Sequence, residues 1–147
     1  MKLFEVFDNI TGLERRFRAA QAAVAYFYGV CQSNPTHVGK DFQVRDIRDC
    51  ALDLEDTYLV RAFAVFEITL RDYWAKRMRR QTHPKAEHLL KGVAARCHHP
   101  SEDLGRAHAV RDYRNWLLHG GVKPEMVTMA EARSSMCKFL SQLPRTW

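Results

Sequence analysis

The chain has 147 residues, 46% of them hydrophobic and 27% charged, and its formal net charge is +6. These values are ordinary for a soluble globular protein and favour one domain over residues 1–147, large enough to fold without a disulfide framework. The most apolar stretch contains Arg61 and Glu67, and the first ten residues contain Glu5 and Asp8. Both patterns argue against a membrane span or a signal peptide, so we expect a cytoplasmic protein with reduced cysteines and no membrane contact.

The first half of the chain predicts two long helical segments. The stretch from Thr11 to Glu14 has the pattern of a capping box, which would begin a helix over residues 13–32. A loop containing proline and glycine follows. Residues 42–80 contain neither of these residue types and predict one long helix, or two with a break near Asp53. Because the middle of this segment is apolar nearly all round, we expect it to be the central helix of a bundle.

The second half predicts shorter helices with clear ends. Pro84 suits the first turn of a helix that ends near Arg96, and Ser101 is a candidate N-cap for a helix over residues 102–119. Two glycines at 120–121 would end that helix, because glycine tolerates positive φ.

A second capping box, from Thr128 to Glu131, would begin a last helix that ends near Leu143. The loops between these segments are short, so neighbouring helices should run antiparallel. The sequence therefore predicts an all-α fold, an up-and-down bundle of five or six helices.

The positive charge is concentrated in one part of the chain. Residues 71–114 hold eleven lysines and arginines against five aspartates and glutamates, whereas the rest of the chain holds twelve of each. A local basic excess indicates an anionic partner, usually a nucleic acid. It is equally typical of a solvated basic face that aids only solubility.

The stretch RNWLLHGG, residues 114–121, places Arg114, Asn115 and His119 in the last turns of a helix that two glycines end. Arginine and histidine at this spacing also arise by chance in a chain of this composition. A histidine in a last helical turn interacts favourably with the helix dipole and needs no catalytic role. The following asparagine, the glycines and the well-capped next helix distinguish this stretch from a chance match.

The same stretch resembles the Arg-polar-x3-His signature of the HEPN superfamily of small all-α domains. The resemblance implies a HEPN-like bundle that forms a homodimer and cleaves RNA as a metal-independent endoribonuclease without a cofactor. It also implies that Arg114, Asn115 and His119 are the catalytic residues, and that an antitoxin or regulatory protein is a partner, since many relatives are toxins or act in phage defence. Some toxin members carry a tyrosine that a nucleotidyltransferase modifies; this chain has Gly121 there, so we do not expect that control.

RNA cleavage needs chemistry that these residue types supply. The 2′-OH of RNA is an internal nucleophile, so the reaction requires a proton acceptor, a proton donor for the leaving 5′-oxygen, and stabilisation of charge on the phosphate. Histidine titrates near neutrality and can exchange both protons. Arginine is permanently charged and offers a planar fork of donors to phosphate oxygens. Asn115 can donate to phosphate or orient an imidazole, and the expected product is a 2′,3′-cyclic phosphate.

Helix geometry predicts how this site is assembled. Five residues of α-helix rotate by about 500°, which leaves Arg114 and His119 about 140° apart around the axis. They cannot share one narrow stripe of a single helix. The long arginine side chain can curl round the helix, or the helix end can open at the glycines. A third solution is a two-fold dimer that brings two copies of the motif into one cleft, and we expect such a composite site where two subunits meet.

Other residues are candidates for supporting roles. Glu67 fits an i,i+4 ion pair with Arg71, and a sharper hypothesis has it orient Arg114 from the central helix. Trp116, Leu117 and Leu118 are expected in the core, as are Tyr73 and Trp74. Contacts to the RNA backbone are predicted for five basic residues: Lys76, Arg77, Arg79, Arg80 and Arg111.

The stretch Cys97-His98-His99 is not expected to bind zinc, because neighbouring side chains rarely converge and no second pair has metal spacing.

Three classes of function fit the sequence. The first is the RNA-cleaving homodimer, a toxin or phage-defence effector. The second is a catalytically inactive HEPN-like binding or dimerisation module in a toxin–antitoxin or defence system. The third is a helix-turn-helix DNA-binding protein made of residues 84–96 and 101–119. Electrostatics disfavours this third class, because Glu102 and Asp103 would face the DNA phosphates.

Overall fold

The computed structural model describes residues 2–78 and 82–147, and it is helical with no strand in these two ranges. The predicted all-α bundle is confirmed. The elements are α1 (Leu3–Ser33), the short 3-10 helix η1 (Pro35–His37), α2 (Val44–Met78), α3 (Ala86–Cys97), α4 (Ser101–His119) and α5 (Met129–Ser141). None of the described helices combines the length and the apolar character that crossing a membrane requires.

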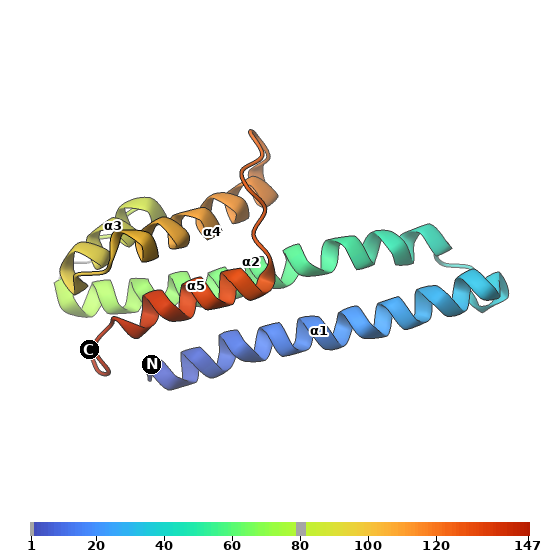
Figure 1. Cartoon of the computed structure of the whole chain (residues 1–147), viewed down its shortest axis with the longest axis horizontal. Helices are drawn as coiled ribbons and strands as arrows, with labels where there is room; N and C mark the ends of the chain where they lie inside the picture. Colours follow the sequence, from blue (N-terminus) through green and yellow to red (C-terminus); the bar gives the residue numbers. More distant parts are fainter. Residues whose placement is uncertain (1, 79–81) are drawn as a thin grey trace.

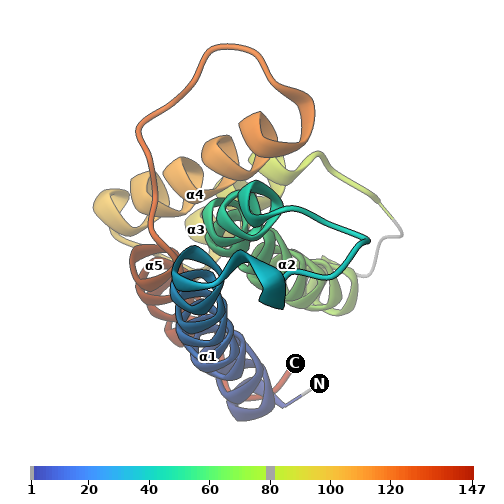
Figure 2. The ribbon, with the colours of Figure 1, turned by 90° about the vertical axis from the view of Figure 1, so that its right-hand side faces the viewer.

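Helix α2 is the centre of the bundle, as the sequence predicted. It contacts each of the other four α-helices. Figure 1 shows α1 and α2 as a long antiparallel hairpin whose tip, around η1, projects beyond the other helices. Figure 2 shows α1 and α4 on opposite sides of α2. The motif at the end of α4 therefore lies on the side of the molecule away from α1.

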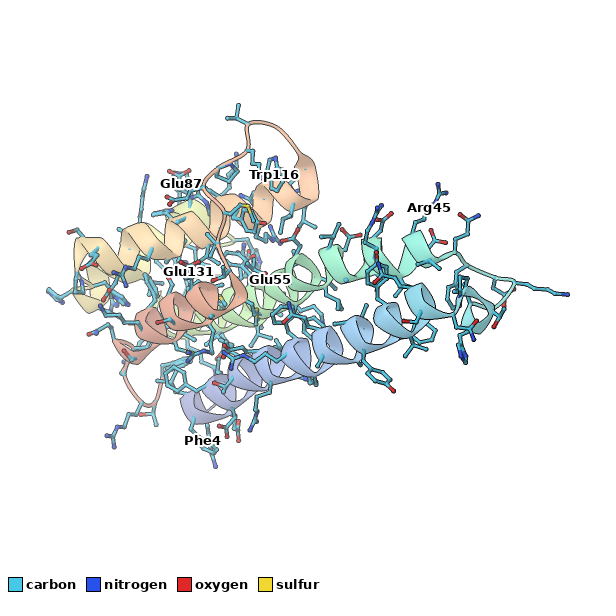
Figure 3. The ribbon with its side chains drawn as sticks, turned by 45° about the vertical axis from the view of Figure 1, so that its right-hand side comes forward. Phe4, Arg45, Glu55, Glu87, Trp116 and Glu131 are labelled. Atoms are coloured by element: carbon cyan, nitrogen blue, oxygen red, sulfur yellow. The ribbon has the colours of Figure 1, made fainter. Side chains whose placement is uncertain are left out.

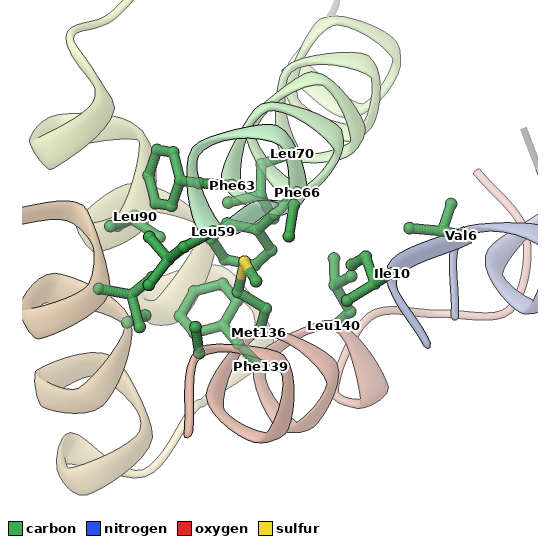
Figure 4. Close-up of a cluster of buried hydrophobic side chains, with 14 of the residues drawn as sticks. Val6, Ile10, Leu59, Phe63, Phe66, Leu70, Leu90, Met136, Phe139 and Leu140 are labelled. Carbon is green, nitrogen blue, oxygen red and sulfur yellow. The ribbon is translucent and has the colours of Figure 1, made fainter. Parts of the chain in front are cut away.

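The core is built from apolar side chains at helical spacing on α1, α2 and α5, with contributions from α3 and α4 (Figure 4). Phe63 and Phe66 of α2 are almost completely buried, and the ring of Phe66 meets that of Phe139 edge-on at 5.6 Å. Burial of side chains this large contributes about 1.5–3 kcal/mol each. This packing fixes the position of α2 and so of the surfaces on which α4 rests.

The predicted start of the first helix is wrong. Helix α1 begins at Leu3, and Thr11 lies inside it. The apolar stripe continues towards the N-terminus through Val6 and Ile10, which are both buried. Gly12 also lies inside the helix, and this packing outweighs its cost of about 1 kcal/mol to helix stability. Glu14, expected in a capping box, instead pairs with Arg18 and Arg133 at 2.8 and 2.6 Å.

Of the two alternatives for the long segment, one continuous helix is confirmed: α2 runs through Asp53 without a break, and its predicted end at residue 80 lies outside the described residues. Smaller differences occur at the starts of α3 and α4. Pro84 precedes α3 rather than lying in its first turn. Ser101 is the first residue of α4, and Pro100 takes the N-cap position. Each correction moves a boundary by one or two residues without changing the order of helices.

The capping box at the start of α5 is confirmed. The backbone N–H of Glu131 donates to Thr128 Oγ1 at 3.3 Å, and the backbone N–H of Thr128 donates to Glu131 Oε2 at 2.9 Å. Glu55 of α2 caps the same turn by accepting from the backbone N–H of Met129 at 2.7 Å. These contacts anchor the loop that connects the end of α4 to the rest of the bundle.

Candidate functional site

Two glycines end α4 directly after the motif, as predicted. Gly120 has φ 71° and ψ −155°, and Gly121 has φ 101°. Side chains with a Cβ rarely adopt these angles, so glycine lets the chain leave the helix here. His119 is consequently the last helical residue, and its side chain is exposed. In the described part of the chain, no residue forms a hydrogen bond, ion pair or ring contact with it.

Arg114 points in a different direction, towards α2. Its side chain is 23% exposed, and its guanidinium carbon lies 5.4 Å from the centre of the Phe63 ring. Nη1 donates to Asn115 Oδ1 at 2.9 Å, and Nη2 lies 3.9 Å from Glu67 Oε2. Nε is buried and has no hydrogen-bond acceptor among the described residues. The guanidinium is thus held in place while most of its donors remain unused.

Glu67 links Arg114 to the start of α3. Its Oε1 accepts hydrogen bonds from Nε and Nη2 of Arg71 at 3.1 and 2.6 Å. Arg71 Nη1 in turn donates to the carbonyl oxygen of Pro84 at 3.0 Å. The expected i,i+4 pair with Arg71 is therefore present, and the same carboxylate lies within ion-pair distance of Arg114. Asn115 was expected to face phosphate or imidazole, but here its oxygen accepts from Arg114.

The residues between Arg114 and His119 are less buried than expected. Trp116 and Leu117 are half-buried against the core, but Leu118 is 49% exposed, so its predicted core position is wrong. Leu118 lies on the outer side of α4, because the inner side is occupied by Val110 and Tyr113. Tyr73 is buried and Trp74 packs against the core, as expected.

Tyr113 anchors this part of α4 to α2. It is 3% exposed, and its hydroxyl donates to Asp56 Oδ1 at 2.9 Å. Burial and this hydrogen bond raise the pKa of Tyr113 to about 12. The ring of Trp116 stacks on that of Tyr113 with a centroid distance of 5.7 Å, and Lys123 Nζ lies 5.0 Å from the centre of the Trp116 ring. Sequence reasoning missed this arrangement, although its i,i+3 spacing was visible.

Six of the eleven basic residues in 71–114 form ion pairs with other described residues. Lys76 binds Asp72 at 2.8 Å, and Arg77 donates to the carbonyl oxygen of Thr146 at 3.4 Å; both remain exposed. Arg111 is only 14% exposed and pairs with Asp112 and Glu87, so it faces the protein rather than solvent. The predicted contacts at Arg79 and Arg80 lie outside the described residues.

The stretch from Cys97 to His99 is engaged in other contacts. Cys97 Sγ lies 3.2 Å from the hydroxyl of Tyr73. His99 Nε2 lies 2.8 Å from the carbonyl oxygen of Phe139, and the two rings pack with centroids 4.0 Å apart. These contacts join the linker before α4 to α2 and α5. All four cysteines are free.

Comparison with known protein families, curated proteins and solved structures gives no significant match for this chain. Any functional assignment therefore depends on the geometry at the end of α4. That geometry combines a positioned arginine with free donors, a neighbouring amide and an exposed imidazole. A fixed cation can bind an anion, and an exposed imidazole can transfer a proton.

Proposed function

We propose that the chain is a metal-independent endoribonuclease of the HEPN type, which cleaves RNA through attack of the 2′-OH and leaves a 2′,3′-cyclic phosphate. The observation that carries this proposal is the way in which the Arg114 side chain is held. Glu67, Asn115 and the Phe63 ring hold its side chain, yet its guanidinium keeps unused donors, and an exposed histidine follows five residues later on the same helix. A preorganised cation of this kind costs little to reposition when charge develops on a phosphate.

Each residue has a defined role in this proposal. Arg114 binds the non-bridging oxygens of the scissile phosphate and stabilises the added negative charge. His119 takes the proton from the 2′-OH or gives one to the leaving 5′-oxygen. Asn115 accepts from Arg114 and keeps the guanidinium turned towards Glu67. Lys76 and Arg77 are exposed and supply backbone contacts away from the scissile phosphate.

We further propose that two subunits share the site. Arg114 faces α2 whereas His119 faces solvent, so one chain alone does not bring both groups onto one stripe. The surface next to His119 in the chain supports a contact between subunits, because Leu118 and Val122 are 49% and 95% exposed. Exposed apolar surface that gathers in one place is typical of an interface. A homodimer would place two imidazoles near one phosphate, one as base and one as acid.

A regulated toxin or phage-defence effector is the biological role that fits such an enzyme, with an antitoxin or regulatory protein as its partner. The alternative is a HEPN-like binding module without activity. One observation favours it: within a chain, none of the described contacts joins Arg114 to His119. The two proposals differ in whether RNA is cleaved.

An RNA cleavage assay in the presence of EDTA separates these proposals. We expect cleavage by the wild type, products that end in 2′,3′-cyclic phosphate, and a loss of about 100-fold or more in Arg114→Ala and in His119→Ala. Arg106→Ala and His88→Ala are matched controls, because both residues are exposed and lie elsewhere on α4 and α3. Cleavage that survives both site substitutions would contradict the proposed mechanism.

Mixing the two inactive variants tests the shared site. If two subunits form one cleft, Arg114→Ala and His119→Ala protomers complement each other in mixed dimers and recover part of the activity. Each variant mixed with itself stays inactive. A wild type that cleaves RNA as a monomer by sedimentation would rule out the composite site and leave the catalytic assignment in place.

A further inference from the structure

The three tryptophans of the chain differ in how their indole N–H groups are used. Trp74 Nε1 donates to Thr82 Oγ1 at 3.0 Å, and Trp147 Nε1 donates to Asp72 Oδ2 at 2.9 Å. The N–H of Trp116 has no acceptor among the residues that the structure describes. Buried or half-buried indoles usually find a partner for this donor. Trp116 therefore keeps a free donor beside the candidate site.

Tyr113 fixes the position of the Trp116 ring. The ring stacks on Tyr113 with an interplanar angle of 27°, and Tyr113 is itself buried and tied to Asp56. Figure 3 shows Trp116 near the end of α4, beside the loop that leads to α5. A ring supported in this way loses little conformational freedom when a ligand packs against it.

The contact from the loop is made by a flexible cation. Lys123 is exposed, and its Nζ lies 5.0 Å from the centre of the Trp116 ring. Neighbouring Val122 is 95% exposed, so the loop holds few apolar contacts at this point. An exposed cation–π contact contributes only about 0.5–1 kcal/mol. Lys123 can thus leave the ring at small cost and bind a phosphate instead.

Helix register places Trp116 next to His119. The two residues are three apart on α4, a spacing that puts side chains on the same face with about 5–6 Å between Cβ atoms. Arg114 and Leu118 are four residues apart and lie together on the opposite face of the helix. A nucleotide whose base rests on the Trp116 ring would therefore carry its ribose and phosphate towards the imidazole.

We propose that Trp116 and Lys123 form a subsite for one unpaired RNA base beside the scissile phosphate. The base stacks on the indole ring, the indole N–H donates to a ribose or phosphate oxygen of the same nucleotide, and Lys123 pairs with a neighbouring phosphate. This inference rests on the proposed function and adds the substrate class. Because a base in a duplex is already stacked on its neighbours, the subsite selects single-stranded RNA.

The test is a binding measurement that does not depend on cleavage. Fluorescence anisotropy compares a short single-stranded 2′-O-methyl RNA, which lacks the nucleophile, with an abasic chain of the same length and charge. One aromatic–base stack corresponds to a change in Kd of about 5- to 150-fold. We expect the Kd of the wild type to be higher by that factor for the abasic chain than for the intact chain. Trp116→Leu should bind both chains with similar, weaker affinity.

Two further variants separate stacking from folding. Trp116→Phe keeps an aromatic ring without the N–H. The logarithm of its Kd ratio between the abasic and the intact chain should be about half that of the wild type. Leu52→Ala removes an exposed apolar side chain from α2, outside the candidate site and the proposed interface, and should bind both chains like the wild type.

A wild type that binds both chains equally, or that binds neither, would overturn the subsite. So would an abasic penalty that persists in Trp116→Leu. If RNA cleavage still depends on Arg114 and His119 in those cases, the proposed function stands and only the subsite fails.

Discussion

Arg114 and His119 belong to one helix, five residues apart, but the structure treats them differently. Arg114 lies against α2, where a carboxylate, an amide and an aromatic ring contact it. His119 stands at the exposed end of the helix without a partner in the described ranges. The chain thus holds the Arg114 guanidinium in place by itself, whereas the described residues do not hold the His119 imidazole.

The two side chains therefore differ in which interactions each of them still lacks. A phosphate can complete the coordination of Arg114 in place, because the guanidinium has donors to spare. Under the proposed function, His119 gains a defined orientation from substrate or from a second subunit. The following predictions test this contrast through stability, from the largest expected effect to the smallest.

The exit from α4 at Gly120 is expected to be the most sensitive position. Its angles belong to a region that only glycine adopts readily, so Gly120→Ala should lower the free energy of unfolding by about 1–3 kcal/mol. Gly105→Ala is the matched control: an added Cβ there has no heavy atom within 4 Å, and alanine in a helix interior gains about 0.5–1 kcal/mol. Urea unfolding measures both. Equal stability of the two variants would show that the exit tolerates other angles.

Arg114→Ala and His119→Ala should differ in stability, although the proposed function predicts a loss of cleavage in both. Arg114→Ala removes the hydrogen bond to Asn115 and the contact with Phe63, which together contribute about 1–2 kcal/mol. His119→Ala should stay within about 0.5 kcal/mol of the wild type, because the side chain is exposed and has no hydrogen bond, ion pair or ring contact with the described residues. Thermal and urea unfolding provide the comparison. A large loss in His119→Ala would mean that the histidine is packed rather than free.

The cap of α5 holds the far end of the loop that follows His119. Thr128→Ala should cost about 1 kcal/mol, because the first turn of α5 loses its side-chain acceptor. Thr11→Ala is the matched control, since Thr11 lies inside α1, where alanine is a better helix former. Circular dichroism melting distinguishes the two variants. A loss in Thr11→Ala as large as that in Thr128→Ala would contradict the continuous α1.

These two threonines also show what the sequence could predict and what it could not. Both precede a glutamate by three residues and have the local pattern of a capping box. Only Thr128 follows a segment without a helical apolar stripe, so only there does a helix begin. At Thr11 the buried side chains of Val6 and Ile10 extend the stripe, and tertiary packing decides the boundary.

Local sequence pattern likewise predicted only the features of the candidate site that do not depend on tertiary packing. Residue types and glycines placed His119 at an exposed helix end, and spacing placed Glu67 beside Arg71. Local pattern could not show that Arg114 and Phe63 come together across two helices, because that contact depends on how α4 crosses α2. It also could not separate Leu118, which is exposed, from its half-buried neighbours.

The projecting α1–α2 hairpin affects how the size of this protein is measured. Helix α2 has 35 residues and is therefore about 50 Å long, whereas a compact chain of this length has a radius of gyration of about 15 Å. Such an elongated particle tumbles and diffuses more slowly than a sphere of equal mass. A single chain would elute early from a gel-filtration column and resemble a pair, so light scattering is the appropriate way to count subunits.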